Sequence, residues 1–70
     1  MLQRILSYEQ INELLRGDIV TNYSNGNQER YRILDTNKSA IKLIRIGEET
    51  LLKVFAPEDL MKHEWFIEDL

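Results

Sequence analysis

Turn-forming residues divide this chain at nearly regular intervals, and their spacing restricts the folds that are open to it. The first is Gly17, and further turn signals follow at Asn25-Gly26, 35–38, Gly47-Glu48 and 57–59. Short apolar runs lie between them, as they do between the strands of small β proteins. The spacing predicts a mostly β fold with one N-terminal helix. The sheet is expected to be either a five-stranded small barrel or a strongly bent antiparallel sheet.

The segment before Gly17 carries the signals of a helix start. Ser7 and Gln10 have the spacing of a capping box, and Leu6 and Ile11 have the spacing of a hydrophobic staple. A glycine at the end supplies the left-handed position that commonly terminates helices. These signals predict a helix over residues 8–16, with an apolar stripe formed by Tyr8, Ile11, Leu14 and Leu15.

Five strands are expected after the helix, the last two separated by a helical turn. The predicted strands cover residues 18–23, 29–35, 40–46, 50–55 and 63–68, and the turn covers residues 57–62. The runs 40–46 and 50–55 are apolar on both faces, which predicts two covered sides. One side would be covered by the barrel interior, and the other by the helix or by a second subunit. In the last strand, Trp65 and Ile67 should share a face that Phe66 does not.

Length and composition predict one globular domain. The chain has 70 residues, of which 43% are hydrophobic and 30% charged, and it contains no cysteine. No apolar stretch reaches the roughly 18 residues of a membrane span, and the N-terminus lacks the pattern of a signal peptide. We therefore expect a complete small reading frame of residues 1–70, located in the cytoplasm and without a membrane contact.

Charge is distributed unevenly along the chain, whose net charge is −3. Residues 28–53 contain six basic and four acidic residues, whereas residues 54–70 contain one basic and five acidic residues. Nucleic-acid binding usually requires a concentrated basic face, because affinity grows with the number of phosphates neutralised. Nucleic acid is therefore not the expected partner.

The predicted order of strands resembles that of the SH3-like barrels, including the Tudor and KOW-type modules. Two features carry the resemblance: the opening Gly17-Asp18-Ile19-Val20 and the helical turn at 57–62 before the last strand. It covers roughly residues 17–69 and implies a small barrel that works by binding. The tyrosine-containing first strand and acidic loop of proline-peptide-binding SH3 domains are not found, nor are the basic loop and glycine of a KOW motif.

The residues needed for catalysis or cofactor binding are not found together in this sequence. His63 is the only histidine, so a paired-histidine zinc motif is excluded, and the three glycines form no phosphate-binding loop. Ser7 is better explained as a helix cap than as a nucleophile. We expect a protein that is not an enzyme, with no catalytic, metal-ligating or cofactor-binding residues.

Eight residues are candidates for a binding surface: Tyr23, Arg30, Tyr31, Arg32, Lys42, Arg45, Trp65 and Phe66. Tyr23, Tyr31 and Trp65 could form a stacking platform or an aromatic cage, although closing the core is the favoured interpretation. The arginines of 29–35, together with Lys42 or Arg45, could form a basic stripe or simply a solvated face. The acidic tail, interleaved with Trp65 and Phe66, could contact a basic partner.

The leading interpretation is a small non-enzymatic intracellular interaction module, of the kind that a phage or mobile element encodes, which binds and modulates a protein partner. A first alternative is a homo-oligomer that sequesters a small nucleotide between subunits. A second is a weak nucleic-acid-binding module of Tudor or KOW type. A purely structural subunit is the remaining class.

Overall fold

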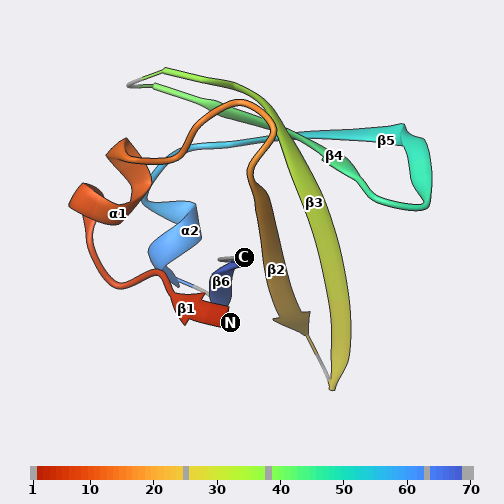
Figure 1. Cartoon of the computed structure of the whole chain (residues 1–70), viewed down its shortest axis with the longest axis horizontal. Coiled ribbons are helices and arrows are strands. Elements are labelled where there is room, and N and C mark those ends of the chain that lie inside the picture. The colour runs from red at the N-terminus through yellow and green to blue at the C-terminus, as the bar shows by residue number, and fades with distance from the viewer. Residues whose placement is uncertain (1, 25, 38, 63, 69–70) are drawn as a thin grey trace.

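One antiparallel sheet and two short helices form the described part of the chain, which comprises residues 2–24, 26–37, 39–62 and 64–68 of a computed structural model (Figure 1). The predicted turn residues Asn25 and Lys38, and also His63, lie outside these ranges. The elements in chain order are β1 (Leu2–Arg4), α1 (Tyr8–Asn12), β2 (Ile19–Ser24), β3 (Asn27–Thr36), β4 (Ile41–Arg45), β5 (Glu48–Phe55), α2 (Asp59–Lys62) and β6 (Trp65–Glu68).

The strand order in the sheet is β1-β6-β2-β3-β4-β5, and every neighbouring pair is antiparallel. The prediction of a mostly β, antiparallel fold is confirmed. The described residues form six strands where five were predicted, and of the two predicted alternatives, a small barrel or a strongly bent sheet, the sheet is not a closed barrel. In the described residues β1 and β5 are its two edges. The result is a small globule with a Cα radius of gyration of 10.9 Å.

The additional strand β1 carries little sequence signal, which explains why it was not predicted. Its three residues are all exposed and do not alternate between apolar and polar side chains. Pairing with β6 forms it, in the register that places Gln3 opposite Ile67. The backbone N–H of Ile5 then donates to the carbonyl of Trp65 at 2.9 Å, which continues the contact beyond the strand.

Helix α1 begins where the sequence predicts, but it ends four residues earlier than residue 16. The capping box is present: the N–H of Gln10 donates to Ser7 Oγ at 3.4 Å, and the N–H of Ser7 donates to Gln10 Oε1 at 3.1 Å. After the helix, the carboxylate of Asp18 accepts the N–H of Leu15 at 2.8 Å. This bond gives the backbone a partner outside the helix, so the chain turns instead of continuing.

Only half of the predicted apolar stripe of α1 lies in the core. Ile11 and Leu14 are buried, whereas Tyr8 and Leu15 are exposed. The predicted hydrophobic staple is wrong as well, because Leu6 is 72% exposed while Ile11 is buried. The N–H of Leu6 instead donates to Gln10 Oε1 at 2.6 Å, so a polar contact fixes the chain entering the helix.

The core lies between one face of the sheet, the inner face, and the segments that contain α1 and α2 (Figure 1). It consists of Ile5, Ile11, Leu14, Val20, Tyr31, Ile33, Ile41, Leu43, Leu60 and Trp65. Side chains alternate between the two faces along each strand. The alternate positions therefore form a second, outer face, which no helix of the described residues covers.

Candidate functional site

The two faces of the sheet separate the eight predicted binding residues. Tyr31 and Trp65 lie on the inner face and are only 2% and 3% exposed, with ring centroids 5.5 Å apart. Trp65 also packs against Phe55, again at 5.5 Å between centroids. These rings close the core, as the favoured interpretation held. They therefore do not join Tyr23 in a stacking platform, and Trp65 is not part of an acidic and aromatic contact surface.

Tyr23 and Phe66 lie together on the outer face. The register of β2 with β6 places Phe66 opposite Thr21. Tyr23 follows Thr21 by two residues on β2, so its side chain lies on the same face. The two rings meet edge to face, with centroids 5.3 Å apart and an interplanar angle of 88°. Both side chains are half-buried. Because each ring already packs against the other, this pair is a structural contact between β2 and β6 with only its outer surface exposed.

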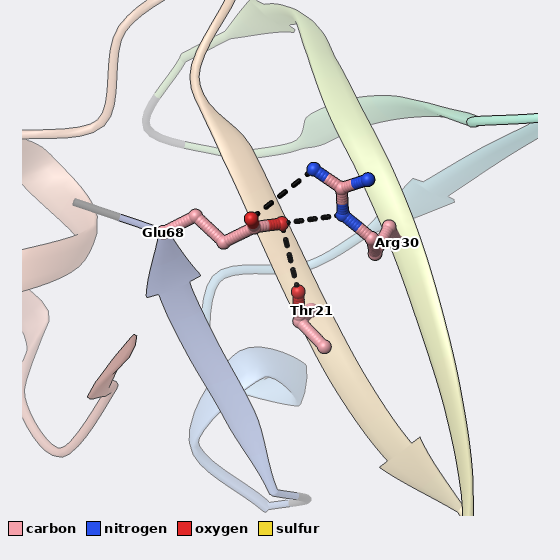
Figure 2. Close-up of polar contacts among 3 residues, drawn as sticks. All are labelled: Thr21, Arg30 and Glu68. Carbon is pink, nitrogen blue, oxygen red and sulfur yellow. Dashed lines mark hydrogen bonds and ion pairs between the residues drawn. The ribbon is translucent and has the colours of Figure 1, made fainter. Parts of the chain in front are cut away.

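Arg30 is held by a polar cluster on the outer face, which Figure 2 shows. Its Nε and Nη2 atoms donate to the two carboxylate oxygens of Glu68, at 2.7 and 3.1 Å. The hydroxyl of the fully buried Thr21 donates to the same carboxylate at 3.2 Å. The Arg30 hydrogen bonds hold the pKa of Glu68 below its usual range, and Glu68 in turn raises the pKa of Arg30.

Arg45 belongs to the inner side of the sheet, opposite Tyr31 in the β3–β4 register. Its Nη1 atom lies 3.4 Å from the carboxylate of Glu29 and 3.9 Å from that of Glu48. The hydroxyl of Tyr31 donates to the Glu29 carboxylate at 3.2 Å. The predicted basic stripe therefore does not include Arg45, which extends the polar rim of the core.

Two of the predicted cations, Arg32 and Lys42, lie exposed on the outer face and have no ion pair within the ranges that the structure describes. Arg32 is opposite Ile44 on β4, and Ile44 is opposite Leu52 on β5. Lys42 is opposite Asp35 on β3 and Val54 on β5. We call this surface the outer patch; it consists of Arg32, Leu34, Lys42, Ile44, Leu52 and Val54.

The apolar half of the outer patch was missed by the residue-level sequence analysis. Leu52 and Val54 are 55% and 56% exposed, and Leu34 is 36% exposed. The signal was available in the runs 40–46 and 50–55, which are apolar on both faces. The inner face of these strands belongs to the core, where Ile41 and Leu43 are buried and Phe55 packs against Trp65. Nothing in the described chain covers their outer face, which leaves the outer patch as the candidate binding surface.

Hollows occur elsewhere on the surface of the described residues, and two of them have volumes of about 270 and 300 Å³. The first lies between α1 and β6 and includes Glu13, Asp18 and Glu68 in its lining. The second lies between α1 and the β3–β4 hairpin and includes Ile11, Ile41 and Pro57. Within the described ranges, no group of three histidine, cysteine or carboxylate side chains is arranged to hold a metal ion.

None of the helices in these ranges is long and apolar enough to cross a membrane. Comparison of the chain with protein-family models, with curated proteins and with solved structures found no match.

Proposed function

We propose that this chain is a small non-enzymatic interaction module that binds a protein partner through the outer patch. The observation that carries the proposal is the exposure of Leu52 and Val54, side by side on edge strand β5. Exposed apolar side chains gathered on one face, with polar residues around them, are typical of protein contact surfaces. Covering them with a partner would release water from apolar area, which is the main driving force of association.

A protein partner explains the outer patch better than a nucleotide or a nucleic acid does. Arg30 and Arg45 are each engaged by carboxylates of the same chain, which leaves Arg32 and Lys42 as the cations of the outer patch. Few positive charges therefore remain for phosphates, whose neutralisation dominates nucleic-acid affinity. The predicted stacking residue Tyr31 is buried, so a base could not reach it without unfolding the core. These two alternatives are the less favoured proposals.

We also propose that β2 to β6 are a variant of the SH3-like arrangement. The support is the position of α2, which connects β5 to β6 as the helical turn before the last strand does in that family. The carboxylate of Asp59 accepts the N–H of Ala56 at 3.1 Å and fixes the entrance to this turn. An intracellular protein of phage or mobile-element type remains our expectation for its setting.

Native mass spectrometry of the protein, gently purified from the cells that naturally make it, tests the proposed function. The wild type should carry the mass of an added protein, and Leu52→Ser with Val54→Ser should lose that mass. Leu6→Ser is the matched control, since Leu6 is more exposed but lies outside the outer patch. If the double variant keeps the partner, or if Leu6→Ser loses it to the same extent, the partner does not bind at the outer patch.

A further inference from the structure

We propose that β5 also pairs with β5 of a second copy, joining the sheets of two protomers edge to edge. The pairing would be antiparallel about a two-fold axis, so both outer faces would lie on the same side of the continuous sheet. The dimer then brings two outer patches together into one surface. The role of that joined surface rests on the proposed function, whereas the pairing itself does not.

The unequal edges of the sheet point to β5 as the pairing strand. At one edge β1 has three residues, whereas β5 at the other edge has eight. An edge strand presents unpaired backbone N–H and carbonyl groups, and proteins usually protect a long edge with charged side chains or with proline. On the outer face of β5, Leu52 and Val54 instead present apolar side chains to solvent.

The sequence of β5 is compatible with its own antiparallel copy in one register in particular. Outer residues must meet outer residues, so Leu52 can lie opposite Thr50, Leu52, Val54 or Ala56 of the second copy. The Thr50 register would place Val54 opposite the charged Glu48 and would separate the two Leu52 side chains. The Val54 register would place Lys53 directly opposite Lys53, and like charges in that position are destabilising. The Ala56 register overlaps the strands least and brings Pro57, which has no N–H to donate, to the end of the pairing.

The remaining register places Leu52 opposite Leu52 and overlaps nearly all of both strands. Leu51 then lies opposite Lys53 of the second copy, and Thr50 lies opposite Val54, so no like charges face each other in this stretch. Lys53 is turned to the inner side, where its Nζ atom lies 5.6 Å from the centre of the Tyr31 ring. Lys53 therefore excludes the Val54 register instead of preventing the pairing.

This register makes the binding surface a composite of both protomers. Leu52 and Val54 of each copy would form one apolar band across the two-fold axis, and they would remain uncovered from above. Arg32 and Lys42 are set back from the axis on β3 and β4 of each protomer, so the two pairs of cations stay apart. A protein partner would then contact two outer patches at once, which raises its avidity.

Sedimentation equilibrium of the purified 8.3 kDa chain, over a wide concentration range, tests the pairing. The average mass should rise toward twice the monomer mass with concentration. Leu51→Glu should tighten the dimer about tenfold, because each new carboxylate faces Lys53 of the second copy; Leu51→Lys should weaken it by a similar factor. The two variants alter the same half-buried position, and circular dichroism of each verifies that it folds. A chain that stays monomeric at all concentrations would overturn the proposal.

Single cysteines test the register, because the chain contains none of its own. Under mild oxidation Leu52→Cys should form a disulfide-linked dimer, whereas Val54→Cys should not, since its two copies would lie too far apart for a disulfide. Leu6→Cys, on the exposed entrance to α1, is the control for random collision. Preferential linkage through Val54→Cys, or equal linkage of all three, would overturn the Leu52 register.

Failure of the dimer and failure of the proposed function give different results. Leu51→Lys leaves all six residues of the outer patch unchanged. If this variant is monomeric but binds the partner as tightly as the wild type, the composite surface is wrong while the proposed function survives. If it dimerises as the wild type does, the register is wrong. We expect Leu51→Lys to lose both the dimer and the binding of the partner.

Discussion

Arg30 and Glu68 form a two-point ion pair across the outer face, although β2 lies between their strands in the sheet (Figure 2). Thr21 on that intervening strand donates to the same carboxylate from a fully buried position. The cluster therefore connects three strands and ties β6 to the centre of the sheet. Arg30, which was predicted as a ligand-binding cation, instead stabilises the sheet.

Acid should remove the contribution of this ion pair to stability. The folded protein holds the pKa of Glu68 below its usual range through the Arg30 hydrogen bond, so folding favours the ionised form. The contribution is fully present above the unfolded pKa, which is about 4.3 for glutamate, and is lost as pH falls through the folded pKa. Urea unfolding of wild type and Glu68→Gln should therefore differ near neutral pH and converge in acid.

Glu64→Gln is the control for this acid dependence, because Glu64 is exposed on the same segment and has no ion pair in the described residues. Its unfolding free energy should follow the wild type across the pH range. If Glu68→Gln and wild type keep a constant difference down to pH 2, the acid effect does not arise at Glu68.

Reversing the charge at Arg30 and at Arg32 should have different consequences for stability. Arg30→Glu places a carboxylate beside Glu68 and should lower the urea midpoint clearly, by repulsion and by loss of the two hydrogen bonds. Arg32→Glu changes an exposed side chain and should stay within about 0.5 kcal/mol of the wild type. The two urea curves are the measurement.

If both charge reversals lower the stability equally, the Arg30 ion pair does not contribute to stability in solution.

Partner binding is expected to respond in the opposite way, because Arg32 belongs to the outer patch. Arg32→Glu should weaken the binding of the partner while the protein stays folded. Loss of binding without loss of stability would identify Arg32 as a contact residue.

Local patterns were sufficient to predict several elements of this fold from the sequence. The capping box of Ser7 and Gln10 located the start of α1, and the alternation in β3 placed Tyr31 and Ile33 in the core. The alternation in β6 correctly separated Trp65 from Phe66. These features depend on neighbours within a few residues, which is the range that periodicity and capping motifs describe.

Features that depend on distant residues were not predictable in the same way. Strand β1 exists because β6, near the other end of the chain, pairs with it. The early end of α1 was missed although its cause is local, since Asp18 accepts the N–H of Leu15 three positions away. Arg30 and Glu68 lie 38 positions apart, so nothing local indicated that the outer-face cation is neutralised. The exposure of Leu52 also depends on which face the helices cover, and the sequence left that choice open.

The two side chains of the capping box, Ser7 and Gln10, should stabilise the protein cooperatively. Ser7→Ala removes the side-chain acceptor for the N–H of Gln10 and should cost about 1 kcal/mol of unfolding free energy. Gln10→Ala removes the acceptor for the N–H groups of both Leu6 and Ser7. Because the two side chains fix the same turn, the double variant should cost less than the sum of the singles. Urea unfolding of the three variants measures this, and strict additivity would contradict a coupled box.

Trp65 and Phe66 are neighbours in sequence on opposite faces of β6, so truncating each of them separates a core role from a surface role. Trp65→Ala should cost about 3–5 kcal/mol, because the ring is 3% exposed and contacts Tyr31 and Phe55. A 70-residue chain has a total stability of only about 4–10 kcal/mol, so this variant should be largely unfolded or close to it. Phe66→Ala, which loses a half-buried ring and its contact with Tyr23, should cost less and stay folded. Guanidinium unfolding followed by far-UV circular dichroism compares them, and a Trp65→Ala protein as stable as Phe66→Ala would mean that the indole does not fill the core.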